Sequence, residues 1–127
     1  MHSSEIIKQY PKAWEKLRAW CIDGLKRQRA EYIEVMKQRG ITGLEIPEIN
    51  DAKDEEVGAM VDVYTRRLYD FFDGQGIYVS IYFHDNNEFT YEICPEGIVV
   101  NGDMYNTRSE SEKLAFGKAF EILEAKL

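Results

Sequence analysis

The sequence contains little cysteine, histidine or proline. Its 127 residues include two cysteines, two histidines and three prolines. Cys21 and Cys94 show no CxxC or Cys/His spacing, whereas a structural zinc site needs about four grouped nitrogen or sulfur ligands. We therefore expect two free thiols in a reducing compartment, and neither a metal nor another cofactor.

Long apolar runs and familiar catalytic motifs are also missing. No run approaches the roughly 18 apolar residues that span a bilayer, and residues 1–5 lack the layout of a signal peptide. The chain has no GxGxxG, Walker loop, HExxH or GxSxG motif. We expect a cytoplasmic protein that has no membrane partner. A non-enzymatic role is favoured over an enzymatic one.

The composition is sufficient for one folded unit. Hydrophobic residues make up 44% of the chain and charged residues 31%, which is ordinary for a globular protein. A length of 127 residues is normal for one domain and short for two. The prediction is a single α+β domain over residues 1–127.

The charge is acidic overall but unevenly distributed. The net charge is −7, yet residues 8–40 carry +5 and residues 41–127 carry −11. An acidic balance makes nucleic-acid binding by the whole molecule unexpected. A polarised chain can orient on a protein partner or on a copy of itself, although a solvated basic helix explains the same pattern.

Two helices are predicted in the N-terminal half. The first runs from Pro11 to Arg39, with a break at Gly24 left open, and its apolar residues recur at spacings of three, four and seven. They are Trp14, Leu17, Cys21, Leu25, Tyr32 and Met36. An apolar connector, 41–50, is expected to lie against the core. A second helix follows through Phe72.

The C-terminal half predicts a sheet and a helix. Apolar residues alternate over 77–84 and 89–94 around a polar turn, which indicates a hairpin. Short further pairings through Tyr105 would extend it to a three- to four-stranded antiparallel meander. Thr107 and Glu110 match a capping box, so a C-terminal helix packed on the sheet is expected.

The first candidate site is an aromatic surface. Tyr78 and Tyr82, together with Tyr105, are expected on the sheet face that points away from the helices. An uncovered face of this kind suits a protein partner, whereas a tryptophan of the first helix would otherwise pack there.

The second candidate is a polar site near the hairpin tip, formed by His84, Asp85 and Glu92. Histidine and carboxylates together can exchange protons with a substrate. Turn tips also collect polar residues simply because they are solvated.

Four short segments carry a resemblance. They are Tyr10–Trp14, Leu68–Asp73, Thr107–Glu110 and Ala119–Glu124. Together they resemble small uncharacterised proteins carried by prophages and mobile elements of gut Bacteroides-type bacteria. The resemblance implies a bacterial or phage cytosolic setting and no catalytic residues.

The leading hypothesis from these observations is a non-enzymatic interaction or accessory protein, either a homodimer or a binder of another protein. The alternatives are a small enzyme or ligand-binding domain with its site near His84 and Glu92, and an acidic inhibitor that mimics nucleic acid.

Overall fold

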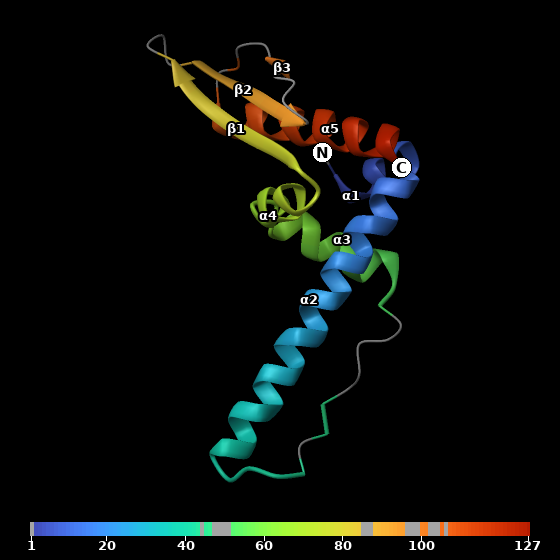
Figure 1. Ribbon diagram of the computed structural model, residues 1–127, viewed down its shortest axis with the longest axis vertical. Helices are drawn as coiled ribbons and strands as arrows, with labels where there is room; N and C mark the ends of the chain where they lie inside the picture. The colour runs from blue at the N-terminus through green and yellow to red at the C-terminus, as the bar shows by residue number, and fades with distance from the viewer. Residues whose placement is uncertain are drawn as a thin grey trace.

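The computed structural model describes residues 2–43, 45–46, 52–84, 88–95, 100–101, 105 and 107–127. It is an α+β structure in which a hairpin, the C-terminal helix and the remaining helices lie in successive layers (Figure 1). The helices are α1 (Ser3–Gln9), α2 (Pro11–Gln38), α3 (Asp54–Val63), α4 (Arg67–Gly74) and α5 (Arg108–Lys126), and the strands are β1 (Ile77–His84), β2 (Glu88–Pro95) and β3 (Val100–Asn101).

A side chain of α5 stabilises the N-terminus of the long helix α2. Pro11 occupies its first turn, where a missing N–H costs nothing. The Glu124 carboxylate of α5 accepts the backbone N–H groups of Lys12 at 3.2 Å and Ala13 at 2.6 Å. A side chain 111 residues away in the sequence therefore caps this helix. The possible break at Gly24 does not occur, because α2 is continuous to Gln38.

The predicted second helix is two helices. At Tyr64 the backbone leaves the helical region (φ −108°, ψ 48°), and α3 ends at Val63. α4 then starts at Arg67. Neither glycine nor proline marks this break, so local sequence signals did not reveal it. The short helix α1 was also not predicted.

The sheet is smaller than the predicted meander. β1 and β2 pair antiparallel over eight positions, from Ile77 opposite Pro95 to His84 opposite Glu88. β3 pairs only two residues with β2, and Tyr105 adds one isolated bridge to Phe89. The sheet therefore consists mainly of a two-stranded hairpin. The described residues do not form the three to four full strands that were predicted.

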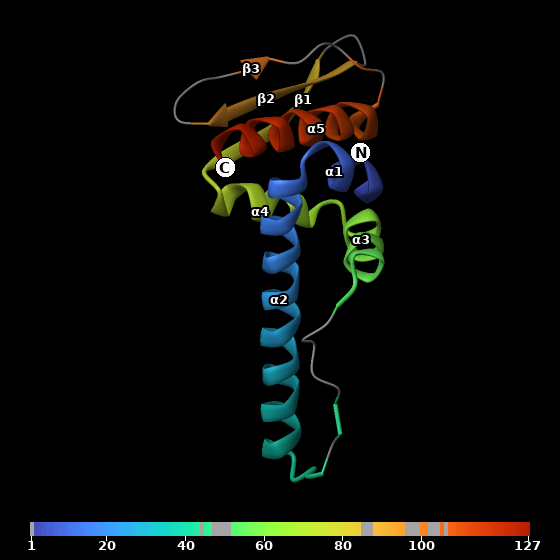
Figure 2. The ribbon, with the colours of Figure 1, turned by 90° about the vertical axis from the view of Figure 1, so that its right-hand side faces the viewer.

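One buried cluster joins the layers. α5 packs between the hairpin and the other helices (Figure 2), so it needs apolar residues on two sides. The cluster is dominated by aromatic rings: Trp14, Phe71, Phe72, Phe116 and Phe120, all 2% exposed or less. Thr107 caps α5 as predicted, since its hydroxyl accepts the N–H of Glu110 at 3.1 Å.

Candidate functional site

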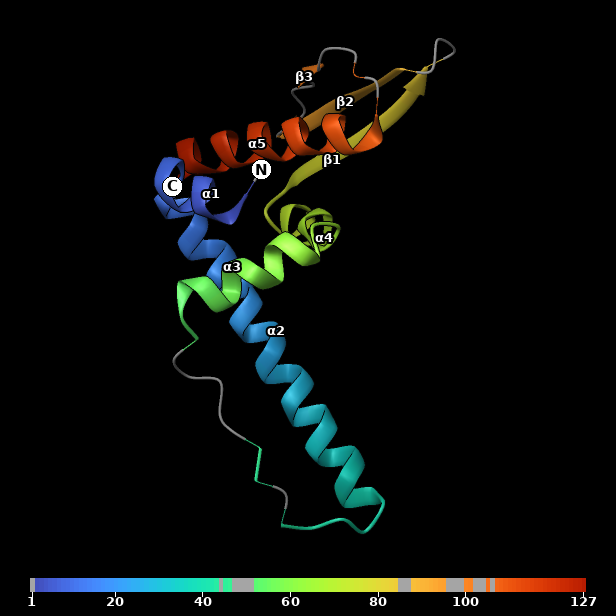
Figure 3. The same cartoon turned by 180° about the vertical axis from the view of Figure 1, so that it is seen from behind.

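The second half of α2 extends away from the rest of the protein (Figures 1 and 3). We call residues 24–38 the arm, and the remaining layers the body. All buried residues of α2 lie between Ala13 and Cys21. In the arm, Tyr32 is 50% exposed and Val35 is 42% exposed. The predicted apolar stripe therefore contributes to the core only in its first half.

One side of the arm carries the connector. Arg29 donates from Nε and Nη2 to the carbonyl oxygen of Ile46, at 3.2 and 2.7 Å. Eleven residues earlier on the same face, Arg18 donates to the carbonyl of Ala52 at 2.6 Å and pairs with Asp54 at 3.1 Å. The prediction that the connector lies against the core is wrong for its described residues, 41–43 and 45–46: none of them packs on the buried cluster, and Ile46 is bound to α2 instead. Residues 44 and 47–51 lie outside the description.

The other side of the arm is open. Trp14, Leu17 and Cys21 are buried at spacings of three and four, and the same spacing continues down the helix. Its later positions are Gly24, Gln28, Glu31, Tyr32 and Val35. We call these five residues the open face. One side of α2 thus packs on the core in the body, and the same side has no buried residue in the arm.

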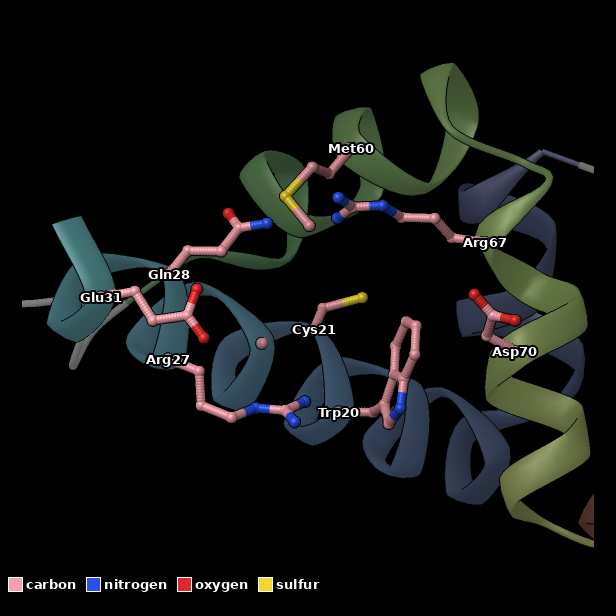
Figure 4. A pocket seen from close by; sticks show the side chains of 9 residues that line it. Trp20, Cys21, Arg27, Gln28, Glu31, Met60, Arg67 and Asp70 are labelled. Carbon is pink, nitrogen blue, oxygen red and sulfur yellow. The ribbon is translucent and has the colours of Figure 1, made fainter. Parts of the chain in front are cut away.

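A cleft with a volume of about 300 Å³ lies where the open face leaves the body (Figure 4). Met60 of α3 and Arg67 and Asp70 of α4 form one side, and residues of α2 from Trp20 to Glu31 form the other. Two arginines, Arg27 and Arg67, and two carboxylates, Glu31 and Asp70, line it. Tryptophan, methionine and arginine are enriched in protein interfaces, whereas glutamate and aspartate are depleted there.

Cys21 is an unsuitable nucleophile for this cleft. Its side chain is 5% exposed, and burial raises the pKa of the thiol to about 11, against a smaller opposing effect of Arg67. The thiolate is the reactive form of cysteine. A thiol that remains protonated at neutral pH provides packing rather than catalysis.

A second cleft, of about 560 Å³, lies between α1, α3 and α5 and is lined by His2 and Asp62 among others. These two residues form a hydroxyl–imidazole–carboxylate arrangement with Ser4. His2 Nδ1 lies 2.9 Å from Ser4 Oγ, and His2 Nε2 lies 3.1 Å from Asp62 Oδ2. Sequence reasoning did not connect these residues, because Asp62 follows 60 positions after His2 and only the packing of α1 on α3 brings them together.

The hydrogen bonds around His2 show that it caps the start of α1. Catalysis of acyl transfer would need free N–H donors beside the hydroxyl to stabilise an oxyanion. The first four N–H groups of α1 are all engaged: Ser3 with Asp62, Ser4 with His2 Nδ1, and Glu5 and Ile6 with the His2 carbonyl. Asp62 also accepts the Ser3 hydroxyl at 2.9 Å. These bonds fasten α1 to α3.

The structure divides the predicted tyrosine surface. Tyr78 and Tyr82 are 55% and 44% exposed and alternate with Ile77, which is buried, so both point away from the helices as predicted. Tyr105 pairs with Phe89, and its ring stacks on Tyr91 with centroids 6.5 Å apart. Directly paired residues share a face, so Tyr105 lies on the opposite side from Tyr78 and Tyr82, and its inclusion was wrong.

The alternation itself has one exception. Phe83 belongs to the same face as Ile77, Val79 and Ile81, but it is 59% exposed. Its ring contacts Phe89 at 5.3 Å between centroids. Phe83 stands near the hairpin tip, beyond the part of the sheet that the core covers.

The predicted polar site falls partly outside the description. Asp85 lies outside the described residues. Glu92 is opposite Ser80, whereas His84 is opposite Glu88, so the backbone positions of His84 and Glu92 are four rungs apart, about 13 Å. A joint acid–base site of these residues stays a prediction.

The described part of the chain contains no group of three or more histidine, cysteine, aspartate or glutamate side chains placed to bind a metal ion. None of its helices combines the length and apolar character that crossing a bilayer requires.

Comparison of the chain with protein-family models, curated proteins and solved structures finds no match.

Proposed function

We propose that this protein is a non-enzymatic interaction protein, and that the open face and the cleft at its base bind another protein molecule. The observation that carries the proposal is the continuation of a core-facing helix stripe into the arm, with Tyr32 and Val35 about half exposed. Exposed apolar residues that follow one helix face provide the anchors of helix-mediated recognition.

The charges support the same proposal. Residues 24–38 carry +2 in a chain with a net charge of −7. A basic segment that extends from an acidic protein can orient an approaching partner. The proposed setting is the bacterial or phage cytosol that the sequence resemblance implies, with no cofactor.

The two clefts favour binding over catalysis. The thiol in the first cleft has a raised pKa, and the imidazole and carboxylate of the second are engaged in fastening α1. Perturbed, available acids and bases are what catalysis requires.

The test compares assemblies formed by the intact chain with those of two variants. Tyr32→Glu places a charge on the open face, and Ala30→Glu places the same charge on the exposed opposite side of α2. Sedimentation of the purified protein, alone and after incubation with bacterial extract, reports any assembly. We expect assemblies that Tyr32→Glu abolishes and Ala30→Glu retains.

Equal assembly of both variants would place binding elsewhere and refute the proposal. A chain that stays monomeric and acquires no partner under either condition would refute it as well.

A further inference from the structure

The open face, together with Arg27 beside it, has a symmetric arrangement of shape and charge about residue 29. We infer that the protein it binds is a second copy of this chain, whose arm lies antiparallel to the first across a two-fold axis near residue 29. This inference rests on the proposed function, because it specifies the partner of the same surface.

Gly24 and Val35 are complementary in shape. A glycine inside a helix costs about 1 kcal/mol relative to alanine, yet a Cβ at Gly24 would meet nothing within 4 Å. The fold of one chain therefore gives no reason for a glycine here. Val35 projects from the same face and is 42% exposed. The two positions are equidistant from the point midway between residues 29 and 30, so an antiparallel copy brings each Val35 to the gap at the other copy's Gly24.

Arg27 and Glu31 carry opposite charges and are placed symmetrically along the arm. These residues line the cleft and are equidistant from residue 29. Within the described residues, neither forms an ion pair shorter than 4.0 Å. In the antiparallel arrangement each Arg27 faces the second copy's Glu31, which gives two reciprocal ion pairs in nearly the same register as the Gly24–Val35 contacts.

The ends of the arms add to this complementarity. An antiparallel copy brings the basic end of its arm, with Lys37 and Arg39, toward the first copy's cleft. Asp70 lines that cleft beside Trp20, so a carboxylate and an aromatic ring are available to the incoming cations. Arg67 lines the same cleft, so the contact at this end combines opposite and like charges.

A parallel pairing lacks these features. Parallel arms in register would place Arg27 against Arg27 and Glu31 against Glu31, and would leave the space at both Gly24 positions empty. Like charges in direct opposition are unfavourable.

The size of the contact sets its strength. Fifteen helical residues span about 22 Å, so the interface lies toward the small end of specific protein interfaces. We expect a dimer that dissociates in the micromolar range.

The experiment is sedimentation equilibrium of the full chain across that concentration range, with charge-exchange variants. Arg27→Glu and Glu31→Arg each place like charges opposite one another, and each should weaken the dimer about tenfold or more. The double variant R27E/E31R restores opposite charges across the axis and should regain most of the affinity. Lys26→Glu changes the same charge on the exposed side away from the open face and should leave dimerisation unchanged.

The outcomes distinguish this inference from the proposed function. Loss in both single variants with recovery in the double variant supports the antiparallel dimer. A strict monomer, or a dimer that the single variants do not weaken, overturns it. If the chain is monomeric but an assembly with another protein is lost in Tyr32→Glu, the proposed function stands while the second copy is excluded. Circular dichroism of each variant verifies that it is folded.

Discussion

The first half of α2 and the arm continue one helix stripe in different surroundings. Trp14 and Leu17 are buried in the part of α2 that packs on α1, α3 and α5, and a distant carboxylate caps the first turn. Tyr32 and Val35 stand in the arm, where Arg29 ties only the opposite side to the connector. The same period of apolar residues therefore builds a core in one half and leaves a surface for binding in the other. Periodicity specifies a face of a helix, and the surroundings decide what that face contacts.

The largest expected difference between the two halves is in stability. Trp14→Ala removes a side chain that is 2% exposed and donates to Asp54 at 3.2 Å. It should lower the free energy of unfolding by about 3–5 kcal/mol. Tyr32→Ala in the arm should change it by less than about 0.5 kcal/mol in the monomer. Urea denaturation at low protein concentration measures both, and equal losses would show that the arm is packed.

The cap of α2 should have the next largest effect. Glu124→Ala removes the acceptor of two backbone N–H groups at the start of α2 and should cost about 2 kcal/mol. Glu121→Ala is the matched control, because that carboxylate is exposed and forms a surface ion pair with Lys118 at 3.3 Å. Its loss should cost less than about 0.5 kcal/mol. Similar melting curves for the two variants would contradict the role of Glu124.

A smaller effect should appear in alkaline solution. Burial raises the pKa of the Cys21 thiol from its ordinary value of 9.0, which applies in an unfolded chain, to about 11. Between these pH values the unfolded state loses the proton while the folded state keeps it, so stability should fall as pH rises from 9 to 11. Burial also raises the pKa of Tyr10 and Tyr69. Cys21→Ala should reduce the slope of the denaturation midpoint against pH in this range. An unchanged slope would show that the thiol does not cause the loss of stability.

The smallest expected effect tests the arm directly. Gly24→Ala should stabilise the monomer by about 0.5–1 kcal/mol, because alanine favours the helix and its Cβ meets open space. The same change should raise the dissociation constant of the dimer, since it fills the gap proposed for Val35. Thermal melting at low concentration and sedimentation at high concentration separate the two effects. A dimer that Gly24→Ala tightens would contradict the proposed close approach of Val35 to Gly24.

Several features were predictable because they depend on near neighbours in the chain. The hairpin follows from alternation at Ile77, Val79 and Ile81, and the start of α5 follows from Thr107 and its bond to Glu110. Distant contacts were not predictable in this way. The break between α3 and α4 lacks a local signal, and the bridge of Tyr105 to Phe89 decides on which side of the sheet that tyrosine lies.

The sequence by itself determined the α+β class, the outward direction of Tyr78 and Tyr82, and the face of α2 on which apolar residues gather, because the periods of helices and strands are local properties. Only the tertiary structure decided where the body ends along α2, that Glu124 caps it, and that Arg27, Arg67 and Asp70 line one cleft. These features depend on groups that are distant in sequence, and only packing brings such groups together.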